Sequence, residues 1–140
     1  MDISFDKRLR ELKLKATPKR LAILEVLADE SIYLTPEEVW KRMRRKSTRA
    51  GLPTVYRNLE ELSACGVLIK IVHPDRRLYY YFCPNSHHHH HFVCLSCRRV
   101  EDLSFCGLEV IDREVKKSLK GAVVSHLVQV YGHCKECLAG

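Results

Sequence analysis

The stretch that decides the fold of this chain is GLPTVYRNLEELSACGVLIKIVHPDRRLYYYFC, residues 51–83. Its first half places Val55, Leu59 and Leu62 at positions i, i+4 and i+7, which is the spacing of one helix face, and Gly66 stands where a C-terminal cap is expected. Its second half contains two β-rich runs, VLIKIVH and RLYYYFC, on either side of a Pro-Asp-Arg turn. We therefore predict a helix that leads directly into a small β-hairpin.

Two more capped helices are predicted upstream of this stretch. Each begins with a Thr-Pro pair, at Thr17 and at Thr35, because threonine is a good N-cap and proline fits the first helical position. At the second pair, Glu38 follows the cap by three residues, as in a capping box, and the helix should run to about Lys46. A shorter amphipathic helix is expected before Thr17. Helices followed by a hairpin form a winged helix-turn-helix, so we assign residues 1–83 to a DNA-binding domain of this type.

The composition changes at PNSHHHHH, which we take as the domain boundary, so that residues 84–140 form the second domain. In this domain we expect strands around Phe92 and over 99–103, a helix over 108–119, and a strand through VVSHLVQVY after Gly121. The predicted fold class is therefore α+β, with an N-terminal winged helix-turn-helix domain and a small C-terminal α/β domain.

Charge is unevenly distributed along the 140 residues, whose net charge is +7. Residues 1–82 contain 17 Lys and Arg against 11 Asp and Glu, whereas residues 83–140 contain 7 against 6. The basic first half is the predicted polyanion-binding region, and a solvated basic face is the alternative. No apolar run is long enough to span a membrane and no secretory signal is recognisable, so we expect a cytoplasmic protein without a membrane partner.

Cysteines are the clearest chemical signal in the sequence. In a reducing compartment the seven cysteines favour metal binding over a disulfide framework. The motifs CLSC and CKEC each offer two thiolates from one turn, and two such pairs complete a tetrahedral zinc site. The predicted ligands are Cys94, Cys97, Cys134 and Cys137. The alternative is two separate redox motifs, but no thioredoxin-like βαβ pattern surrounds them. Four sulfur ligands leave no open position for catalysis, so the zinc is predicted to be structural and the protein not to be an enzyme.

The five consecutive histidines, residues 87–91, precede the first cysteine pair. If the strand at Phe92 extends back through them, His89 and His91 face one side and His88 and His90 the other, so that one segment serves two metal sites. Imidazole and thiolate ligands suit zinc. Candidate partners are Cys83, His73, Asp102, Glu109 and His126. Each has a plain alternative, because Cys83 can simply pack, Glu109 can be solvated and His126 can be a core histidine. Cys65 and Cys106 have no partner at ligand spacing and are predicted to be small buried apolar residues.

The predicted recognition helix opens with groups that suit base contacts. Arg57 can bind a guanine, Asn58 an adenine, and Tyr56 a thymine methyl or a phosphate, with the hydroxyl of Thr54 beside them. Cations elsewhere in the first half are predicted to contact phosphates without reading sequence. These cations are Lys15, Lys19, Arg20, Lys41, Arg42, Arg44, Arg45 and Lys46, part of which can equally be a solvated face.

Several segments together resemble the ferric uptake regulator family of metal-dependent repressors. They are LKLKATPKRLAILEVL, TPEEVW, GLPTVYRNLEEL, HHHHHFVCLSC and YGHCKEC, in an order that spans nearly the whole chain. The resemblance implies a winged-helix DNA-binding domain, a C-terminal α+β dimerisation domain and a homodimer. It also implies metal-dependent binding to palindromic double-stranded operator DNA and repression of metal-uptake genes. Whether dimers pair further on DNA stays open.

The resemblance implies two ligand sets beyond the four cysteines. A regulatory site between the domains draws on His89 and His91, and a second site within the dimerisation domain draws on His88, His90, Glu109 and His126. Iron and peroxide sensors of the family have a histidine just before the T-P-E-E-like helix, where this chain has Tyr33.

Zinc sensors of the family resemble this chain better, because they use a cysteine at the hairpin end, matched here by Cys83, and often a histidine matched by His90. Their acidic ligand early in the hairpin falls near Ile69, so His73 or Asp102 is the alternative last ligand of the regulatory site. A zinc uptake regulator is the favoured interpretation. An iron(II) or peroxide sensor, with iron(II) or manganese as the regulatory ion, is the alternative.

Two other classes of protein fit the sequence less well. A zinc hydrolase or deaminase would need an open metal position with an adjacent glutamate, as in H-x-E, and this chain offers H-x-H instead. A metal-storage protein would explain the histidines but not the capped helices that carry Tyr56 and Arg57.

Overall fold

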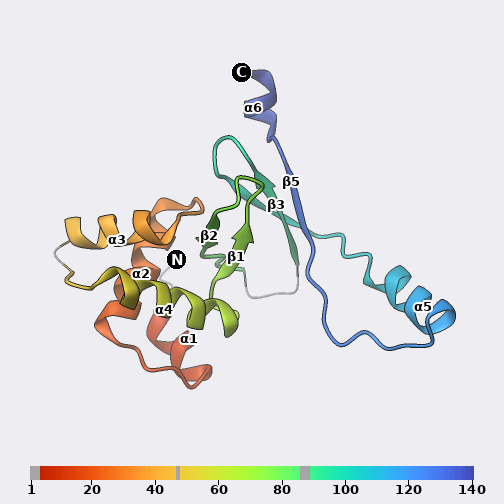
Figure 1. Cartoon of the computed structure of the whole chain (residues 1–140), viewed down its shortest axis with the longest axis horizontal. Coiled ribbons are helices and arrows are strands. Elements are labelled where there is room, and N and C mark those ends of the chain that lie inside the picture. Colours follow the sequence, from red (N-terminus) through yellow and green to blue (C-terminus); the bar gives the residue numbers. More distant parts are fainter. Residues whose placement is uncertain (1–3, 47, 86–88) are drawn as a thin grey trace. The chain divides into compact units, whose positions relative to one another are not determined.

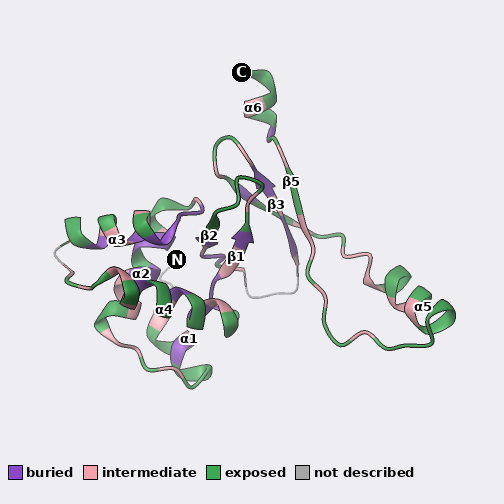
Figure 2. Cartoon of the chain, viewed as in Figure 1, coloured by how far each residue is buried: buried purple, intermediate pink, exposed green. Residues whose placement is uncertain are grey.

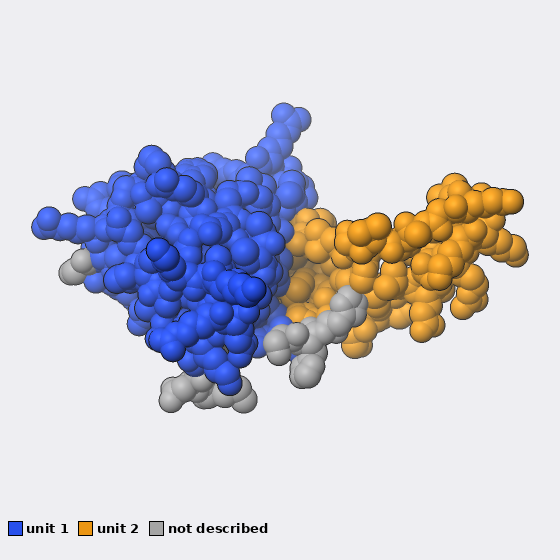
Figure 3. All heavy atoms as spheres, turned by 90° about the horizontal axis from the view of Figure 1, so that it is seen from below, with its two compact units in different colours: residues 1–86 blue, residues 87–140 orange. Residues whose placement is uncertain are grey.

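The computed structural model describes residues 4–46, 48–85 and 89–140. The chain divides into two compact units, Met1–Ser86 and His87–Gly140 (Figures 1 and 3). The first unit contains four helices and a hairpin, and the second contains a three-stranded sheet with two helices. The predicted α+β class, with a helical N-terminal region and a C-terminal β/α region, is confirmed.

The helices of the first unit begin where the sequence places their caps. They are α1 (Phe5–Glu11), α2 (Pro18–Glu30), α3 (Pro36–Arg45) and α4 (Leu52–Ala64). The hydroxyl of Thr17 accepts a hydrogen bond from the backbone N–H of Arg20 at 3.2 Å. The hydroxyl of Thr35 accepts one from the N–H of Glu38 at 3.2 Å, and the Glu38 carboxylate accepts one from the Thr35 N–H at 3.1 Å. The predicted capping box is therefore confirmed.

A tight reversal connects α4 to the hairpin. Gly66 has a φ of +80°, a left-handed conformation that glycine adopts without steric cost, and it follows the helix C-cap at Cys65. The antiparallel strands β1 (Ile69–Val72) and β2 (Leu78–Tyr81) follow. Within their turn, the carboxylate of Asp75 accepts a hydrogen bond from the N–H of Arg77 at 2.9 Å. The predicted hairpin is confirmed. The prediction that Cys65 is buried is wrong, because this C-cap position is exposed.

The core of the first unit is a continuous apolar cluster to which every helix and the hairpin contribute (Figure 2). Leu9, Leu24, Val39, Leu59 and Tyr80 are almost fully buried in it, one from each of the four helices and one from β2. An isolated bridge between Leu34 and Tyr80 ties the segment before α3 to the hairpin, with N–H to O distances of 2.9 and 2.8 Å. The hairpin is thus held against the same apolar core that α4 packs on.

The second unit is built on a three-stranded sheet with the order β4-β3-β5. Its elements are β3 (His90–Cys94), β4 (Val100–Leu103), α5 (Leu108–Ser118), β5 (Gln129–Gly132) and α6 (Lys135–Ala139). The two earlier strands and α5 form where they were predicted. The strand predicted through VVSHLVQVY is too long, because β5 pairs in parallel with β3 only from Gln129 onward and residues 121–128 have no regular structure. Helix α6 was not predicted.

Apolar side chains of the second unit are largely exposed in the single chain. Helix α5 has no buried residue (Figure 2). Val124, in the segment after α5, is 98% exposed. Other exposed apolar side chains are Phe105, Val110, Ile111, Leu119, Leu127 and Leu138. Among the described residues, no helix has the length and apolar character needed to cross a membrane.

Candidate metal centres and nucleic-acid interface

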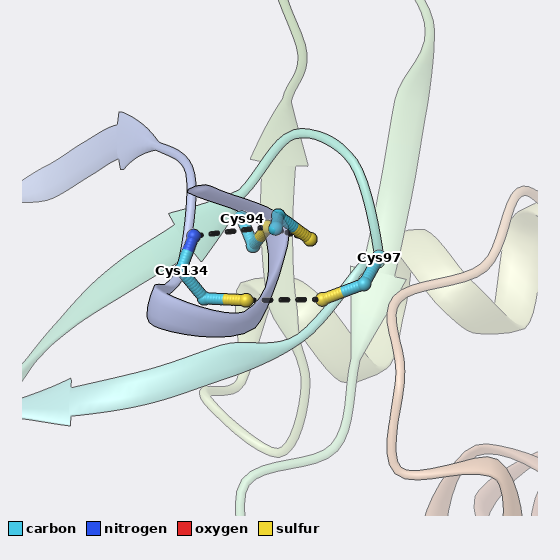
Figure 4. Close-up of side chains that lie close together, drawn as sticks. Cys94, Cys97 and Cys134 are labelled. Atoms are coloured by element: carbon cyan, nitrogen blue, oxygen red, sulfur yellow. Dashed lines mark hydrogen bonds between the residues drawn. The ribbon is translucent and has the colours of Figure 1, made fainter. Parts of the chain in front are cut away.

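Four cysteines come together at one end of the sheet, and Figure 4 labels three of them, Cys94, Cys97 and Cys134. Cys94 ends β3, Cys97 lies in the turn after it, Cys134 is the N-cap of α6 and Cys137 lies within α6. Their sulfur atoms lie within 4.8 Å of one another, with Cys94 Sγ 3.7 Å from Cys137 Sγ and Cys97 Sγ 3.6 Å from Cys134 Sγ. Sulfur atoms on a tetrahedral zinc with bonds of about 2.3 Å are about 3.8 Å apart. The four thiols therefore already have the spacing of a zinc site, which is the predicted four-cysteine cluster.

The charge state of this cluster also favours a cation. Burial raises the pKa of the Cys94 thiol, but backbone N–H groups of Cys97, Cys134 and Ser96 outweigh it and lower that pKa to about 6. Contacts with the sulfur atoms of Cys134 and Cys94 raise the pKa of Cys137 to about 12. The Cys94 thiol therefore ionises readily, whereas the raised pKa values of Cys134 and Cys137 oppose further ionisation, as expected when thiols lie close together. A divalent ion such as zinc relieves that repulsion and binds the thiolate forms.

A second group of ligand-type side chains lies on one face of the sheet. His89 Nε2 lies 2.9 Å from His91 Nε2, and the carboxylate of Asp102 on β4 lies 3.3 Å from His89 Nε2 and 3.8 Å from His91 Nε2. Asp102 is opposite His91 in the β3–β4 register, which places its side chain on the same face. Burial, together with the charge of His89, lowers the pKa of His91, so its imidazole stays in the neutral form that binds metal.

The two other predicted partners of this group belong to the first unit. Cys83 is buried and directly follows Phe82 of the apolar core, and its sulfur contacts the carbonyl of Asn85. His73 follows β1, where its Nδ1 accepts a hydrogen bond from the Asp75 N–H at 3.0 Å and lies 3.1 Å from the Asp75 carboxylate. Of the two alternatives for the last ligand, Asp102 is therefore the one found beside both histidines.

Tyr33 occupies the position at which the resemblance to iron and peroxide sensors requires a histidine. Its side chain is 1% exposed, and its ring makes an edge contact with Tyr79 at 4.9 Å and a tilted contact with His73 at 6.0 Å. Tyr33 is thus a packed residue of the first unit.

The opposite face of β3 carries a third group. His90 Nε2 lies 3.1 Å from Cys106 Sγ, and the same sulfur lies 3.2 Å from His126 Nε2. The predicted alternation of the histidine run is therefore observed for His89, His90 and His91, whereas His88 lies outside the described residues. The prediction that Cys106 is merely a small buried residue is wrong, since it is partly exposed and contacts two imidazoles. Glu109, predicted as a ligand beside His90 and His126, is exposed in the first turn of α5, and among the described residues the group with these histidines contains Cys106 instead.

The first turns of α4 present polar groups outward. Tyr56 and Arg57 are exposed, and an Arg57 Nη2 donates to the hydroxyl of Thr54 at 3.5 Å. The Tyr56 hydroxyl donates to the carboxylate of Glu37 on α3, and this bond raises the pKa of the tyrosine, which therefore stays a protonated donor. Arg57 and Tyr56 are thus exposed at this end of the helix, with the half-buried Thr54 beside Arg57 and the Tyr56 hydroxyl bonded to Glu37.

Arg20 and Asn58, also predicted to contact DNA, are engaged within the protein. Arg20 Nε donates to Asn58 Oδ1 at 3.0 Å, its Nη1 donates to the Lys15 carbonyl at 3.1 Å, and its Nη2 lies 2.5 Å from the Glu61 carboxylate. Asn58 Nδ2 donates to the Thr54 carbonyl at 2.9 Å. The Arg20 side chain is only 13% exposed. Through these bonds Arg20 connects α2 to Asn58 and Glu61 on α4.

Other cations of the first unit fall into two groups. Some form salt bridges, and others line a hollow on the surface. Arg42 pairs with Glu30 at 2.8 Å and Lys46 with Asp29 at 2.7 Å, so part of the predicted phosphate-binding run is a salt-bridged surface. A separate hollow beside the start of α4 is lined by Lys19, Trp40, Arg44, Thr48, Arg49, Ala50 and Gly51. Sequence analysis missed Arg49, because its place depends on tertiary contacts: the Trp40 Nε1–H bond to the Ala50 carbonyl at 2.8 Å and the Thr48 N–H bond to the Met43 carbonyl at 3.0 Å hold this loop against α3.

Comparison with known proteins is consistent with this arrangement. A family model described as the ferric uptake regulator family matches residues 11–131. The ferric uptake regulation protein of Bacillus subtilis (strain 168) is 33% identical over 134 residues, which cover 94% of this chain and 90% of that protein. The peroxide operon regulator of the same strain is 27% identical over 129 residues, which cover 92% of this chain and 88% of that protein.

Solved structures show the same fold. The ferric uptake regulator of Vibrio cholerae aligns with a TM-score of 0.65 at 30% identity, covering 94% of this chain and 100% of that chain. A zinc uptake regulator in complex with zinc and DNA aligns with a TM-score of 0.75 at 23% identity, covering 96% and 90%, a likeness of fold alone.

Proposed function

This chain belongs to the ferric uptake regulator family and is a metal-responsive transcriptional regulator, and we propose that zinc is the ion to which it responds. The observation that carries the proposal is the group formed by His89, His91 and Asp102, together with the packed Tyr33 at the position of an iron sensor's histidine. Two imidazoles and a carboxylate are a common partial ligand set for zinc.

Cys83 is the proposed further ligand of this regulatory site, on the ground of its place six residues before His89 at the end of the hairpin segment. Thiolate joined to two imidazoles favours zinc over manganese, which prefers oxygen ligands. Zinc, when bound, supplies a positive centre that holds its ligands in one arrangement. Because ligands from both units would then be constrained together, binding shifts the population toward the arrangement that fits DNA.

The proposed DNA contacts follow from the first unit. Tyr56 and Arg57 are exposed and Thr54 is half-buried at the start of α4, and all three are proposed to meet base edges, with Lys15 on a nearby phosphate. Arg20 and Asn58 are proposed to act mainly by holding α4 in place, since their polar atoms are engaged between α2 and α4.

The proposed active species is a homodimer bound to a palindromic operator, where it represses metal-uptake genes. A second copy of this chain is the proposed partner of the exposed apolar residues of the second unit, which include Phe105, Val110 and Val124. Two recognition helices related by a two-fold axis would read two half-sites.

The experiment that tests this function is a DNA-binding titration against buffered free metal. The protein, saturated with zinc, iron(II) or manganese in parallel, selects its preferred duplex from a random pool. Affinity for that duplex is then measured at increasing free concentrations of each ion, starting from protein that retains only the structural zinc. We expect zinc to induce binding at the lowest free concentration. Failure to enrich any duplex would refute DNA regulation, and induction by iron(II) at lower free concentration than zinc would refute the choice of metal.

Variants of two cysteines distinguish a role of Cys83 in metal sensing from a general effect of removing a thiol. Cys83→Ala should abolish or strongly weaken the zinc dependence of operator binding, whereas Cys65→Ser, at an exposed C-cap, should leave it unchanged. Unchanged zinc dependence in Cys83→Ala would remove Cys83 from the site.

Variants of two cations test the proposed division of DNA contacts. Arg57→Ala should cost roughly 1–3 kcal/mol on the selected duplex and relax its specificity, whereas Lys15→Ala should weaken all duplexes alike. Equal losses on selected and random duplex for Arg57→Ala would contradict the base contact.

A further inference from the structure

The group on the second face of β3 has a sulfur atom at its centre. Cys106 lies in the segment between β4 and α5, and His126 lies in the segment between α5 and β5, so three separate parts of the second unit meet here. The ligand-type atoms of His90, Cys106 and His126 all lie within 4.8 Å of one another. The two imidazole rings have centroids 4.9 Å apart and an interplanar angle of 67°.

We propose that His90, Cys106 and His126 form a second metal site with a thiolate ligand, selective for soft late transition ions such as zinc. It deepens the proposed metal-responsive function by naming the donors and the metal class of its second site. The family resemblance puts a carboxylate, Glu109, in this site, and replacing that oxygen by sulfur changes which ions the site prefers. Thiolate and imidazole select zinc or copper(I), whereas carboxylate-rich sites suit manganese.

The distances fit a shared ion. Nitrogen and sulfur ligands on a tetrahedral zinc, with bonds of about 2.0 and 2.3 Å, lie about 3.5 Å apart. The distances from Cys106 Sγ to His90 Nε2 and to His126 Nε2 are 3.1 and 3.2 Å, so a movement of a few tenths of an ångström admits the ion. His90 is 4% exposed, which limits competition from water on one side of the group.

Backbone conformation explains why cysteine, rather than the glutamate three residues later, reaches the histidines. Gly107 has a φ of +72°, which turns the chain sharply between Cys106 and the start of α5. A Cβ at Gly107 would meet the ring of Phe105 at 3.2 Å, so the turn favours glycine on two counts. After this turn Glu109 is exposed, while Cys106 stays beside His90.

The site would also organise segments that have little other packing. The segments containing Cys106 and His126 have no regular secondary structure, and α5 between them has no buried residue. A metal ion bound by His90 on β3, by Cys106 and by His126 would attach the segments before and after α5 to the sheet. The alternative is a hydrogen-bonded cluster of one thiol and two imidazoles that binds no metal. The experiment must distinguish this cluster from a metal site.

The test uses full-length protein carrying Cys83→Ala, with one equivalent of zinc retained by the four structural thiolates. Cobalt(II) is then added, because a thiolate bound to cobalt gives a near-ultraviolet charge-transfer band that imidazole and carboxylate ligands do not give. We expect one equivalent of cobalt to produce this band. We expect the added substitution Cys106→Ser to abolish it, and the added substitution Glu109→Gln to leave it unchanged. Cys65→Ser is the matched thiol control and should also retain the band.

Three outcomes would overturn the site: cobalt bound without the band, the band retained in the Cys106→Ser protein, or the band lost in Glu109→Gln. If Cys106→Ser prevents folding, His126→Gln keeps the thiol and should weaken cobalt affinity at least tenfold, and unchanged affinity would reject the site. Operator binding, measured in protein that retains Cys83, is a separate readout. A cobalt-thiolate band without metal-dependent DNA binding rejects only the proposed function, and the reverse result rejects only this site.

Discussion

The two units of this chain are stabilised in different ways. The first unit buries a continuous apolar cluster drawn from four helices and a hairpin. In the described part of the second unit, the buried side chains are His90, His91, Val93, Cys94, Val100 and Cys134, most of them of metal-binding type. Large apolar side chains of the second unit, such as Val124 and Phe105, are instead exposed. The first unit should therefore fold by its own core, whereas the second should depend on metal and on a partner subunit.

The largest expected difference between the units comes from removing the structural zinc. A chelator strong enough to strip Cys94, Cys97, Cys134 and Cys137 should unfold the second unit, since the apparent binding free energy of a structural zinc is about 10–16 kcal/mol. Hydrogen exchange read by segment should show loss of protection in β3 and β5, with α2 and α4 still protected. A mild chelator that spares the four thiolates is the control and should leave both units protected. Simultaneous loss of protection in both units would contradict the conclusion that the two units are stabilised in different ways.

The converse change is made in the core of the first unit. Leu59 is 0% exposed, and Leu59→Ala should destabilise this unit by about 2–5 kcal/mol, the cost of a lost side chain plus the cavity left behind. Trp40 is the single tryptophan, so its fluorescence during denaturation reports the first unit alone. Zinc content of the second unit should not change. Leu12→Ala, at a position that is 41% exposed, should cost only about 0.5 kcal/mol or less.

Dependence of the second unit on a partner copy is tested at its most exposed apolar side chain. If a second copy covers Val124, Val124→Asp loses the burial of one apolar side chain in each subunit, about 1.5–3 kcal/mol per subunit, and weakens a symmetric dimer by roughly 100-fold or more. Analytical ultracentrifugation at several concentrations measures this. Ser125→Asp adds the same charge at the next exposed position, so equal dissociation by both variants would point to net charge instead of apolar contact.

The sequence predicted those parts of both units that depend on near neighbours. Thr17 and Thr35 satisfy N–H groups three residues away, so the helix starts could be read directly. The alternation of His89, His90 and His91 follows from the two-residue period of a strand, which needs no tertiary information.

Features that depend on distant segments could not be predicted in the same way. Cys106 meets His90 and His126 from 16 and 20 residues away, after a turn whose direction is set by Gly107. The engagement of Arg20 by Asn58 joins residues 38 apart, and nothing in local spacing distinguishes such an arginine from a phosphate contact. Residues 121–128 alternate like a strand but lack the pairing with β3 that β5 obtains from Gln129.

The smallest expected effect concerns how the hairpin is held to α4 in the first unit. The Glu60 carboxylate on α4 lies 2.6 Å from Lys70 Nζ on β1 and accepts a hydrogen bond from the Tyr80 hydroxyl on β2. The bond from Lys70, then that from Tyr80, lowers the pKa of Glu60. Because half of the Glu60 side chain is exposed, solvent screens this pair, and Glu60→Gln should cost about 1 kcal/mol or less at neutral pH.

The sign of the pH dependence of this stabilisation follows from the lowered pKa of Glu60. A carboxyl group whose pKa is lower in the folded state contributes stability above its unfolded pKa of about 4.3, and this contribution disappears as pH falls through the folded pKa. The difference in unfolding free energy between the natural protein and Glu60→Gln, followed by Trp40 fluorescence, should therefore be constant above about pH 5.5 and shrink below about pH 4.3. Asp29→Asn, which removes the exposed pair with Lys46 away from the hairpin, is the matched control. A difference that grows as the pH falls would mean that Glu60 does not stabilise the hairpin as a carboxylate.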